Sequence, residues 1–531
     1  MSDEDLPLAA LEISGVAPVT ASFSHGGDVP STSLQPAAEA ASPEIGGRRR
    51  WFHMAALLLG VSALFFGVSA CSFTPHHVRP PQPVPQSYAQ ATSPGDSIAR
   101  IDWREFFRDA ELQRLIEQAL ANNRDIRIAA ARLAEARAAW RIEGASLYPQ
   151  LDAVGTGSRG ETLFNLPGSG ATPVDVRQVS AQLSASWEID FWGRLRSLRE
   201  AARWQYLATE EARRAVATDL VAQVANGYLL ERHYEERAAL ARRSIETREE
   251  ALRMLRRRYE VGSGSKLDMT QAQVLLAQAQ TTLQGLEQER AVNRNALALI
   301  LGGPIEIAPG TLSLTEVPQD VLLPAGLPSD LLTSRPDIVA AEHQLRAADA
   351  NIGAARAAFF PSISLTGAYG TMSDELGGLF SAGSEAWSFT PTIRLPLFNA
   401  GRLKGNLDVM RARRERVIAE YELTVQSAFR DVSDALVQRR QLQLQIRTTG
   451  ELLKAQQERA RLAQLRFDYG RSAYLEVLDA QRDLFDAEQA MVQLRRAELA
   501  SIVALYSALG GSFAASSFSN IPQEAGKGQT S

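Results

Sequence analysis

The sequence contains one cysteine in 531 residues, which excludes internal disulfides and cysteine-based metal clusters. Histidine is also rare: beyond Cys71 only His76, His77, His233 and His343 remain, and no two have the i, i+4 spacing of a helical zinc site. There is no Gly-x-Ser-x-Gly nucleophile motif. A net charge of −5 gives no basic surface for nucleic acid. We therefore expect no catalytic residues, no metal site, no enzyme activity and no nucleic-acid partner.

The single cysteine ends a segment with the features of an export signal. Three arginines, Arg48 to Arg50, precede an apolar run from Met54 to Val68, and small residues follow up to Cys71. The run is shorter than the roughly 20 residues that span a bilayer, which favours a cleaved signal at 48–70 over the alternative, an uncleaved anchor. Residues 1–47 are expected to be a disordered extension or to precede the true start codon.

The last four residues of this signal, Val68-Ser69-Ala70-Cys71, resemble the lipobox of bacterial lipoproteins. In that motif the cysteine becomes the first residue of the mature chain and carries a covalent lipid, so the resemblance implies lipidation of Cys71 and no other cofactor. By the same rule, Ser72 after the cysteine implies sorting to the outer membrane. The proline-rich segment that follows cannot form a helix or a central strand, so residues 71–100 are expected to be a lipid anchor and tether.

Proline is absent between Pro173 and Pro304 and again between Pro396 and Pro522. Windows of this length without a helix breaker can hold helices far longer than the globular average. Turn residues occur inside each window, at 262–265 and 470–472. Each window therefore predicts a long helical hairpin, whose first helix, over 194–259 or 402–469, would extend about 100 Å.

The chain also contains an internal duplication. Asp125-Ile126 and Tyr148-Pro149 recur 212 residues later, as Asp337-Ile338 and Phe360-Pro361. Four further matches recur 208 residues later: Gly193-Arg194-Leu195, Gly262, Leu267-Asp268 and Gly302-Gly303. We therefore expect two copies of one unit, at 101–303 and 333–511, with a linker at 304–332 and a tail at 512–531. The β-hairpins are expected at about 149–192 and 361–397, and the helical hairpins at about 194–301 and 401–509.

The predicted strands alternate between apolar and polar residues. From Val179 to Phe191 the odd positions are apolar and the even positions polar, and the pattern repeats from Trp387 to Leu395. Their partners are expected at 151–157 and 363–369, with glycine- and serine-rich loops at 158–175 and 370–384. This alternation is typical of outer-membrane strands, although a half-buried soluble sheet has it too.

Strand number sets a further condition. Four strands cannot close a barrel, and an open edge in lipid leaves backbone groups without hydrogen bonds. If the strands cross a membrane, several chains must share one barrel. Two chains would supply eight strands and three would supply twelve, and a water-filled lumen favours three.

The duplicated unit, the junctions Asp190–Leu195 and Pro396–Leu403, and the turn Gly470–Gln481 resemble the TolC-like outer-membrane factors. The resemblance covers about residues 100–515, and the lipobox points to the lipoprotein branch, the OprM-like NodT family of efflux-pump lipoproteins. It implies a mainly α fold with a membrane β-barrel, in which a homotrimer shares a 12-strand barrel in the outer membrane and a 12-helix coiled-coil tube in the periplasm. The linker and the tail would form an equatorial region around the tube.

The same resemblance implies a passive channel of a tripartite efflux system. Its partners would be outer-membrane lipid, a periplasmic adaptor (membrane fusion protein) and an inner-membrane pump of the resistance-nodulation-division type. Two alternatives stay open at this stage: the outer-membrane component of a type I protein export system, and a lipid-anchored periplasmic coiled-coil scaffold without a pore. The exported compound is expected to be selected by the pump.

The family places its aperture where the helical hairpins turn, at Gly262 and Gly470. Glu476 and Asp479, spaced i, i+3 on one helix face, stand at the places of the aperture acids, with Glu476 where the TolC pattern has Asp. Asp268 occupies the corresponding place in the first copy. A ring of such carboxylates would favour cations. Arg471 and Lys266 are candidate latch residues, and Gly193 and Gly401 mark the strand-to-helix junctions. The alternative for these charges is a solvated helix face.

Overall fold

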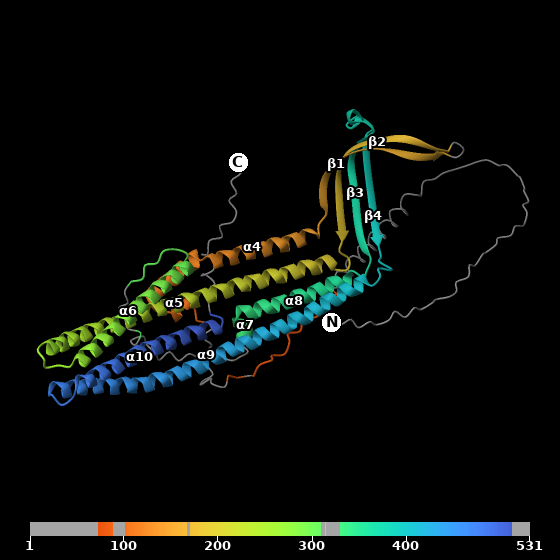
Figure 1. The fold of residues 1–531 in the computed structure, drawn as a ribbon. Coiled ribbons are helices and arrows are strands. Elements are labelled where there is room, and N and C mark those ends of the chain that lie inside the picture. The colour runs from red at the N-terminus through yellow and green to blue at the C-terminus, as the bar shows by residue number, and fades with distance from the viewer. Residues whose placement is uncertain are drawn as a thin grey trace, which may run out of the picture. The chain divides into compact units, whose positions relative to one another are not determined.

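The computed structural model describes residues 73–85, 87–88, 101–166, 170–308, 314 and 330–511. Every described residue belongs to one unit of the chain, Val68–Ser531. The extension 1–47, the signal 48–70, Cys71, most of the linker 304–332 and the tail 512–531 lie outside the described residues. The elements (Figure 1) are α2 (Trp103–Phe106), α3 (Ala110–Asn122), α4 (Arg124–Ala145), β1 (Gln150–Leu166), β2 (Gly170–Ile189), α5 (Arg194–Glu260), α6 (Lys266–Leu301), α7 (Leu331–Ser334), α8 (Pro336–Ala357), β3 (Ser362–Ser373), β4 (Glu385–Arg394), α9 (Arg402–Asp468) and α10 (Tyr474–Ala508).

The same order of elements occurs twice. A helix of 22 residues, two strands, a helix of 67 residues and a helix of 35 or 36 residues follow one another in each half, as α4 to α6 and as α8 to α10. This confirms the duplicated unit. Both 67-residue helices are free of proline, as a continuous ladder of backbone hydrogen bonds requires.

The four strands form one antiparallel sheet in the order β1-β2-β3-β4. Its first hairpin is longer than expected: β1 and β2 stay paired from Gln150 opposite Ser186 to Leu166 opposite Gly170. The predicted loops at 158–175 and 370–384 were therefore wrong in part, because most of 158–175 and residues 370–373 are strand. Glycine and serine in these stretches suggested turns, but extended backbone also accommodates them once a partner strand supplies the ladder.

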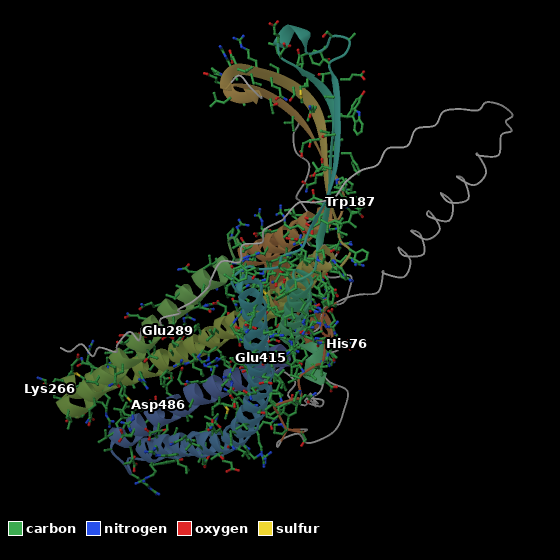
Figure 2. The ribbon with its side chains drawn as sticks, turned by 90° about the vertical axis from the view of Figure 1, so that its right-hand side faces the viewer. His76, Trp187, Lys266, Glu289, Glu415 and Asp486 are labelled. Carbon is green, nitrogen blue, oxygen red and sulfur yellow. The ribbon has the colours of Figure 1, made fainter. Side chains whose placement is uncertain are left out.

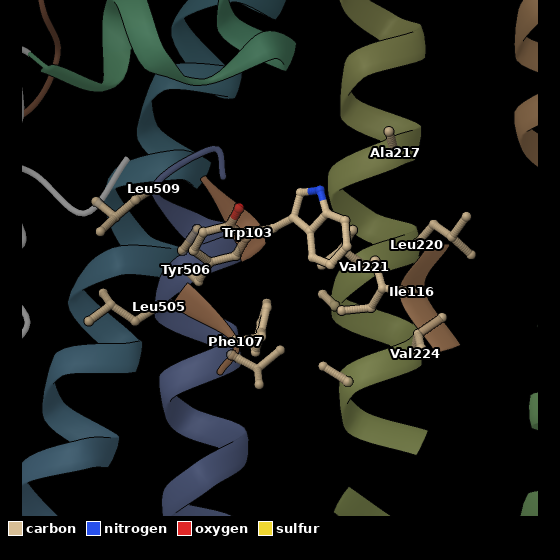
Figure 3. Close-up of a cluster of buried hydrophobic side chains, with 14 of the residues drawn as sticks. Trp103, Phe107, Ile116, Ala217, Leu220, Val221, Val224, Leu505, Tyr506 and Leu509 are labelled. Atoms are coloured by element: carbon tan, nitrogen blue, oxygen red, sulfur yellow. The ribbon is translucent and has the colours of Figure 1, made fainter. Parts of the chain in front are cut away.

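The largest hydrophobic core lies where α2, α3 and the end of α10 meet α5 and α9 (Figure 3). Trp103 of α2 is fully buried, and Phe106 stacks on Tyr506 of α10 with ring centroids 4.5 Å apart. Val221 and Val224 of α5 complete the contact and are also fully buried. Residues from the start, middle and end of the chain thus hold the two helical hairpins together.

Residues 73–85, 87 and 88, which we call the N-terminal strap, contain no helix or strand, as their proline content predicts. The strap nevertheless packs against the folded body. Phe73 stacks on Phe360 at 4.8 Å, and its carbonyl oxygen accepts a hydrogen bond of 3.1 Å from Arg356. At the other end Tyr88 is buried and stacks on Phe429 of α9 at 5.1 Å.

Polar contacts join the middle of the strap to α8. His77 Nδ1 lies 3.2 Å from Asp349 Oδ2, and Arg79 lies 2.5 Å from Glu342 Oε2. Both carboxylates are almost fully buried. The strap is therefore bound to α8 along much of the length of that helix.

None of the helices in the described part of the chain combines the length and the apolar character needed to cross a bilayer.

Candidate functional site

The sheet presents one continuous apolar face. The odd-numbered residues in the described pairing are all apolar over Leu151–Gly157, Val179–Ile189, Ile363–Tyr369 and Trp387–Ile393, and we call them the apolar face. Leu183 lies opposite Tyr369, and Tyr369 lies opposite Trp387, so the face runs across neighbouring strands. These three side chains are 52%, 60% and 76% exposed. Large apolar surface of this kind marks an interface with a partner or a membrane.

The apolar face ends abruptly at one level of the first hairpin. Arg159 and Arg177 lie opposite each other on the same side of the sheet, one step beyond Gly157 and Val179. Both form ion pairs with Asp175, at 3.0 and 3.5 Å. The change from aliphatic to charged residues indicates a boundary between an apolar medium and water.

The even-numbered residues of the same strand segments, which are polar except for Val154 and Ala368, form the polar face. Ser180 of β2 and Thr156 of β1 share a hydrogen bond of 2.6 Å across the hairpin. The serine, threonine and glutamine side chains of this face include Gln182, Ser184, Ser186, Ser364, Thr366, Ser388, Thr390 and Thr392. Because successive side chains of a strand point to opposite sides, one sheet separates an apolar surface from a hydrophilic one.

Each strand pair joins its long helix at a glycine with positive φ, Gly193 at 76° and Gly401 at 84°. Near the first junction, Trp192 donates a hydrogen bond of 2.9 Å to the carbonyl oxygen of Pro361. Trp187, also at this end of the sheet (Figure 2), donates one of 3.0 Å to Leu147. A cavity of about 310 Å³ lies between the two junctions.

The helical hairpins turn at Gly262 and Gly470, which have φ of 76° and 69°. A Cβ atom at either position would meet nothing within 4 Å, so the requirement for glycine is conformational. Lys266, at the start of α6, lies at the far end of the helices from the sheet (Figure 2).

The candidate aperture acids form ion pairs within the chain. Glu476 lies 3.1 Å from Arg466 of α9, and Asp479 lies 3.4 Å from Arg482, one turn along α10. Each of the four side chains is roughly half exposed. Arg466 and Arg482 were missed in the sequence, although the i, i+3 spacing of Asp479 and Arg482 signals their pair.

The other candidate aperture and latch residues take no part in these ion pairs. Asp268 lies in the first turn of α6, where Ser265 caps the helix. In the described part of the chain, Lys266, Arg471 and Asp268 have no ion-pair partner within 4 Å. Within a single chain, Glu476 and Asp479 therefore pair with Arg466 and Arg482. The latch role expected for Arg471 and Lys266 stays a prediction.

A small apolar cluster joins the two hairpins near their turns. Tyr474, Val477 and Leu478 of α10 pack with Leu255 of α5 and Ala272 of α6. Burial raises the pKa of Tyr474 to about 12, so this phenol stays neutral. The tips of the two hairpins are thus packed against each other through apolar side chains.

Polar contacts continue this link away from the turns. Arg237 Nε of α5 donates to Gln489 Oε1 of α10 at 2.5 Å, and Gln489 Nε2 donates to the Arg237 carbonyl at 3.1 Å. His233, one turn earlier, is buried, and its pKa is lowered to about 4 by burial and by the charges of Arg237 and Arg496. These contacts connect the first copy of the unit to the second.

Among the residues that the structure describes, no group of three or more His, Cys, Asp or Glu side chains could hold a metal ion.

The chain matches the family described as “Outer membrane efflux protein” over residues 115–303 and 327–511, which correspond to its two repeats. It is 42% identical over 461 residues to the probable efflux pump outer membrane protein TtgC of Pseudomonas putida, covering 86% of this chain and 95% of TtgC. It is 40% identical over 448 residues to the cation efflux system protein CusC of Escherichia coli K12, covering 84% of this chain and 97% of CusC.

Solved structures agree with this match. A membrane protein from Pseudomonas aeruginosa aligns with a TM-score of 0.78 and 39% identity, over 83% of this chain and 98% of its own. The open state of the MtrE outer membrane channel of Neisseria gonorrhoeae aligns with a TM-score of 0.75 and 38% identity, over the same shares. The chain therefore belongs to the outer membrane efflux protein family and is the outer-membrane component of an efflux system, not an enzyme.

Proposed function

We propose that three copies of this chain form one channel that carries compounds passively across the outer membrane. The observation that carries this proposal is the two-faced sheet with two unpaired edges. In the described residues β1 pairs only with β2, and β4 only with β3. An open edge in lipid leaves backbone N–H and C=O groups unsatisfied, at several kcal/mol each. Pairing β4 of one copy with β1 of the next removes both edges, and three copies give a barrel wide enough for water.

The height of the apolar face fits a membrane. Val179 to Ile189 covers ten residue steps, about 34 Å along the strand. At a strand tilt of about 45° this corresponds to about 24 Å, close to the apolar band of about 25 Å on outer-membrane barrels. The apolar face would then contact lipid, and the polar face would line the lumen.

In the trimer the tips of the helical hairpins would form the periplasmic aperture. Three copies bring six carboxylates, from Glu476 and Asp479, to one opening, and Asp268 adds three more from the first repeat. Within each chain, Arg466 pairs with Glu476 and Arg482 pairs with Asp479, so these six carboxylates are balanced by six arginines. Lys266 and Arg471 lie on the same tips and could pair with a neighbouring copy, which would latch the aperture shut.

A lipid on Cys71 would hold the chain in the outer membrane on its periplasmic side. Phe73, two residues later, is tied by its stacking on Phe360 to the start of β3. The test is metabolic labelling with a fatty acid, which Cys71→Ser should abolish; labelling that persists would assign the lipid to another residue.

The partners of this channel would be a periplasmic adaptor at the tips and an inner-membrane pump of the resistance-nodulation-division type. Relatives named for toluene efflux, antibiotic efflux and cation efflux are 42%, 42% and 40% identical to this chain. The chain is thus about equally similar to proteins named for the efflux of very different compounds. This supports a channel that does not select the exported compound itself, so that the pump selects it.

Conductance tests the channel directly. The purified protein, reconstituted in planar bilayers, should form pores, and Glu476→Ala combined with Asp479→Ala should raise their open probability. A protein that stays monomeric and never conducts, even with both substitutions, would contradict the proposal and favour a scaffold without a pore.

A further inference from the structure

The cavity between the strand-to-helix junctions is lined by residues of both repeats. Arg194 and Glu188 come from the first repeat, and Arg394, Arg402 and Pro396 come from the second. Glu188 belongs to the polar face, and Arg394 follows the last residue of that face on β4, so the cavity lies at the base of the polar face. Because of the duplication, each residue of the first junction has a counterpart 208 positions later in the second, so the charges of the two junctions can be compared directly.

The first junction is electrically balanced. Arg194 binds both carboxylate oxygens of Glu188 at 2.8 Å. Asp190 Oδ2 accepts hydrogen bonds from the Arg196 backbone at 2.8 Å and from the Arg196 guanidinium at 3.2 Å. Each of the two cations at this junction therefore has its own carboxylate.

The second junction keeps the cations and lacks both carboxylates. At the displacement of 208 residues, Arg402 and Lys404 correspond to Arg194 and Arg196, whereas Pro396 and Phe398 stand in place of Glu188 and Asp190. In the described part of the chain, the side chain of Arg402 has no hydrogen-bond or ion-pair partner. Its charge at the cavity is therefore uncompensated.

A second arginine adds to this imbalance. Arg394, the last residue of β4, lines the same cavity and is likewise without a side-chain partner among the described residues. The cavity thus holds two free guanidinium groups beside the carboxylates of Glu188 and Asp190, which are paired with Arg194 and Arg196. Guanidinium groups bind phosphate and carboxylate through paired N–H donors, and such charge-assisted hydrogen bonds are stronger than neutral ones.

We propose that this cavity is a binding site for an oxyanion, a phosphate or a carboxylate group, held by Arg394 and Arg402. The oxyanion replaces the carboxylates that the second repeat lacks. Two sources offer this chemistry. A soluble organic anion can reach the site along the polar face, and the phosphate of a lipid headgroup can reach it from the base of the sheet, where Leu397 and Phe398 are 87% and 89% exposed.

Trp192 supplies a direct reporter, because its indole lines the cavity and stacks on Phe360 at 4.7 Å. The test titrates inorganic phosphate onto the purified full-length protein in detergent and follows tryptophan emission. In parallel, the protein is placed in nanodiscs of phosphatidylglycerol or of phosphatidylcholine. Trp192→Phe should remove the signal, which assigns it to the cavity.

We expect a saturable change with phosphate if the source is a soluble anion. If the source is a lipid, we expect a larger change in phosphatidylglycerol nanodiscs than in phosphatidylcholine nanodiscs, because the choline cation neutralises the charge of the headgroup phosphate. Arg402→Gln should weaken binding by about tenfold or more, the loss expected for a charge-assisted hydrogen bond. Pro396→Glu restores a carboxylate at the position of Glu188 and should have the same effect with the arginine intact. Arg411→Gln, an exposed arginine of α9 outside the cavity, is the control and should bind as the wild type does.

No change with either probe would overturn the proposal. So would retained binding in folded Arg402→Gln or Pro396→Glu protein, each checked by size-exclusion chromatography. The anion site and the channel can be tested independently. If the wild-type protein conducts but binds neither probe, only the anion site is rejected. If it binds a probe but never conducts, only the channel is rejected.

Discussion

Arg466 Nη1 lies 3.1 Å from Glu476 Oε1 and joins the end of α9 to the first turn of α10. This ion pair links the two helices on either side of the turn at Gly470. The helical hairpin of the second repeat is therefore held at its tip by a contact within one chain.

Removing the tip charges should change ion selectivity more than stability. Because both side chains of the Arg466–Glu476 pair are roughly half exposed, Glu476→Gln with Asp479→Asn should change the free energy of unfolding by less than about 1 kcal/mol. The pore should lose part of its preference for cations, since the carboxylates lie at its narrow end. Reversal potentials in a KCl gradient measure this preference. Glu458→Gln, which breaks an exposed ion pair elsewhere on α9, is the control, and a selectivity equal to that of the control would place the acids outside the aperture.

The two faces of the sheet should respond oppositely to a charge. Leu183→Arg puts a guanidinium on the apolar face near the middle of the band, where a cation in lipid costs about 2–4 kcal/mol. Gln182→Arg, the adjacent residue on the polar face, should be tolerated. The yield of folded oligomer in outer membranes, read from heat-modifiable migration on gels, compares the two. Equal yields would show that neither face contacts lipid.

The packing of the N-terminal strap against α8 should depend on Gly353. A Cβ atom at Gly353 would lie 2.4 Å from Thr74 Oγ1 and 2.9 Å from Thr74 backbone nitrogen, so Gly353→Ala should displace the strap. Hydrogen exchange of residues 73–85 should then accelerate. Gly285→Ala on α6 meets nothing within 4 Å and should only add helix propensity, about 0.5–1 kcal/mol. Unchanged exchange in the Gly353 variant would show that the strap adapts without leaving α8.

The buried His233 should make stability depend on pH. Its folded pKa of about 4 lies below the unfolded value of about 6.5, so the unfolded chain takes up a proton between these values and the folded chain does not. Stability is then full above about pH 6.5 and falls as the pH drops toward 4, by up to about 3 kcal/mol per chain. Melting temperatures at pH 7.5 and pH 5 should therefore differ less in His233→Gln than in the wild type. The exposed His76→Gln should keep the wild-type difference, and an unchanged difference in His233→Gln would assign the pH dependence to other groups.

Much of the fold is readable in the sequence because it depends on local periodicity. Proline-free windows and the positions of Gly193 and Gly401 locate the starts of α5 and α9, since helix continuity is set by the backbone of the helix itself. The alternation from Val179 to Ile189 predicts a two-faced strand for the same reason, because side-chain direction has a period of two. The duplication is visible in the residues directly.

Contacts between distant residues had to come from the tertiary structure. The pairing of Arg159 with Arg177 extends the first hairpin through a stretch whose glycines and serines suggest a loop, because a partner strand outweighs weak local propensity. The binding of the strap to Glu342 and Asp349 depends on residues more than 260 positions away. The ion pair between Arg466 and Glu476 is likewise set by how two helices meet across a turn.

The sequence by itself thus determined the duplicated unit, the lengths of the helices and the two faces of the sheet, because these follow from repeats and periods along the chain. Only the tertiary structure decided that Arg466 pairs with Glu476 across the turn and that, among the described residues, Arg394 and Arg402 are left free at the second junction. Pairing between separate elements depends on distances between side chains, and no pattern along the chain specifies those distances.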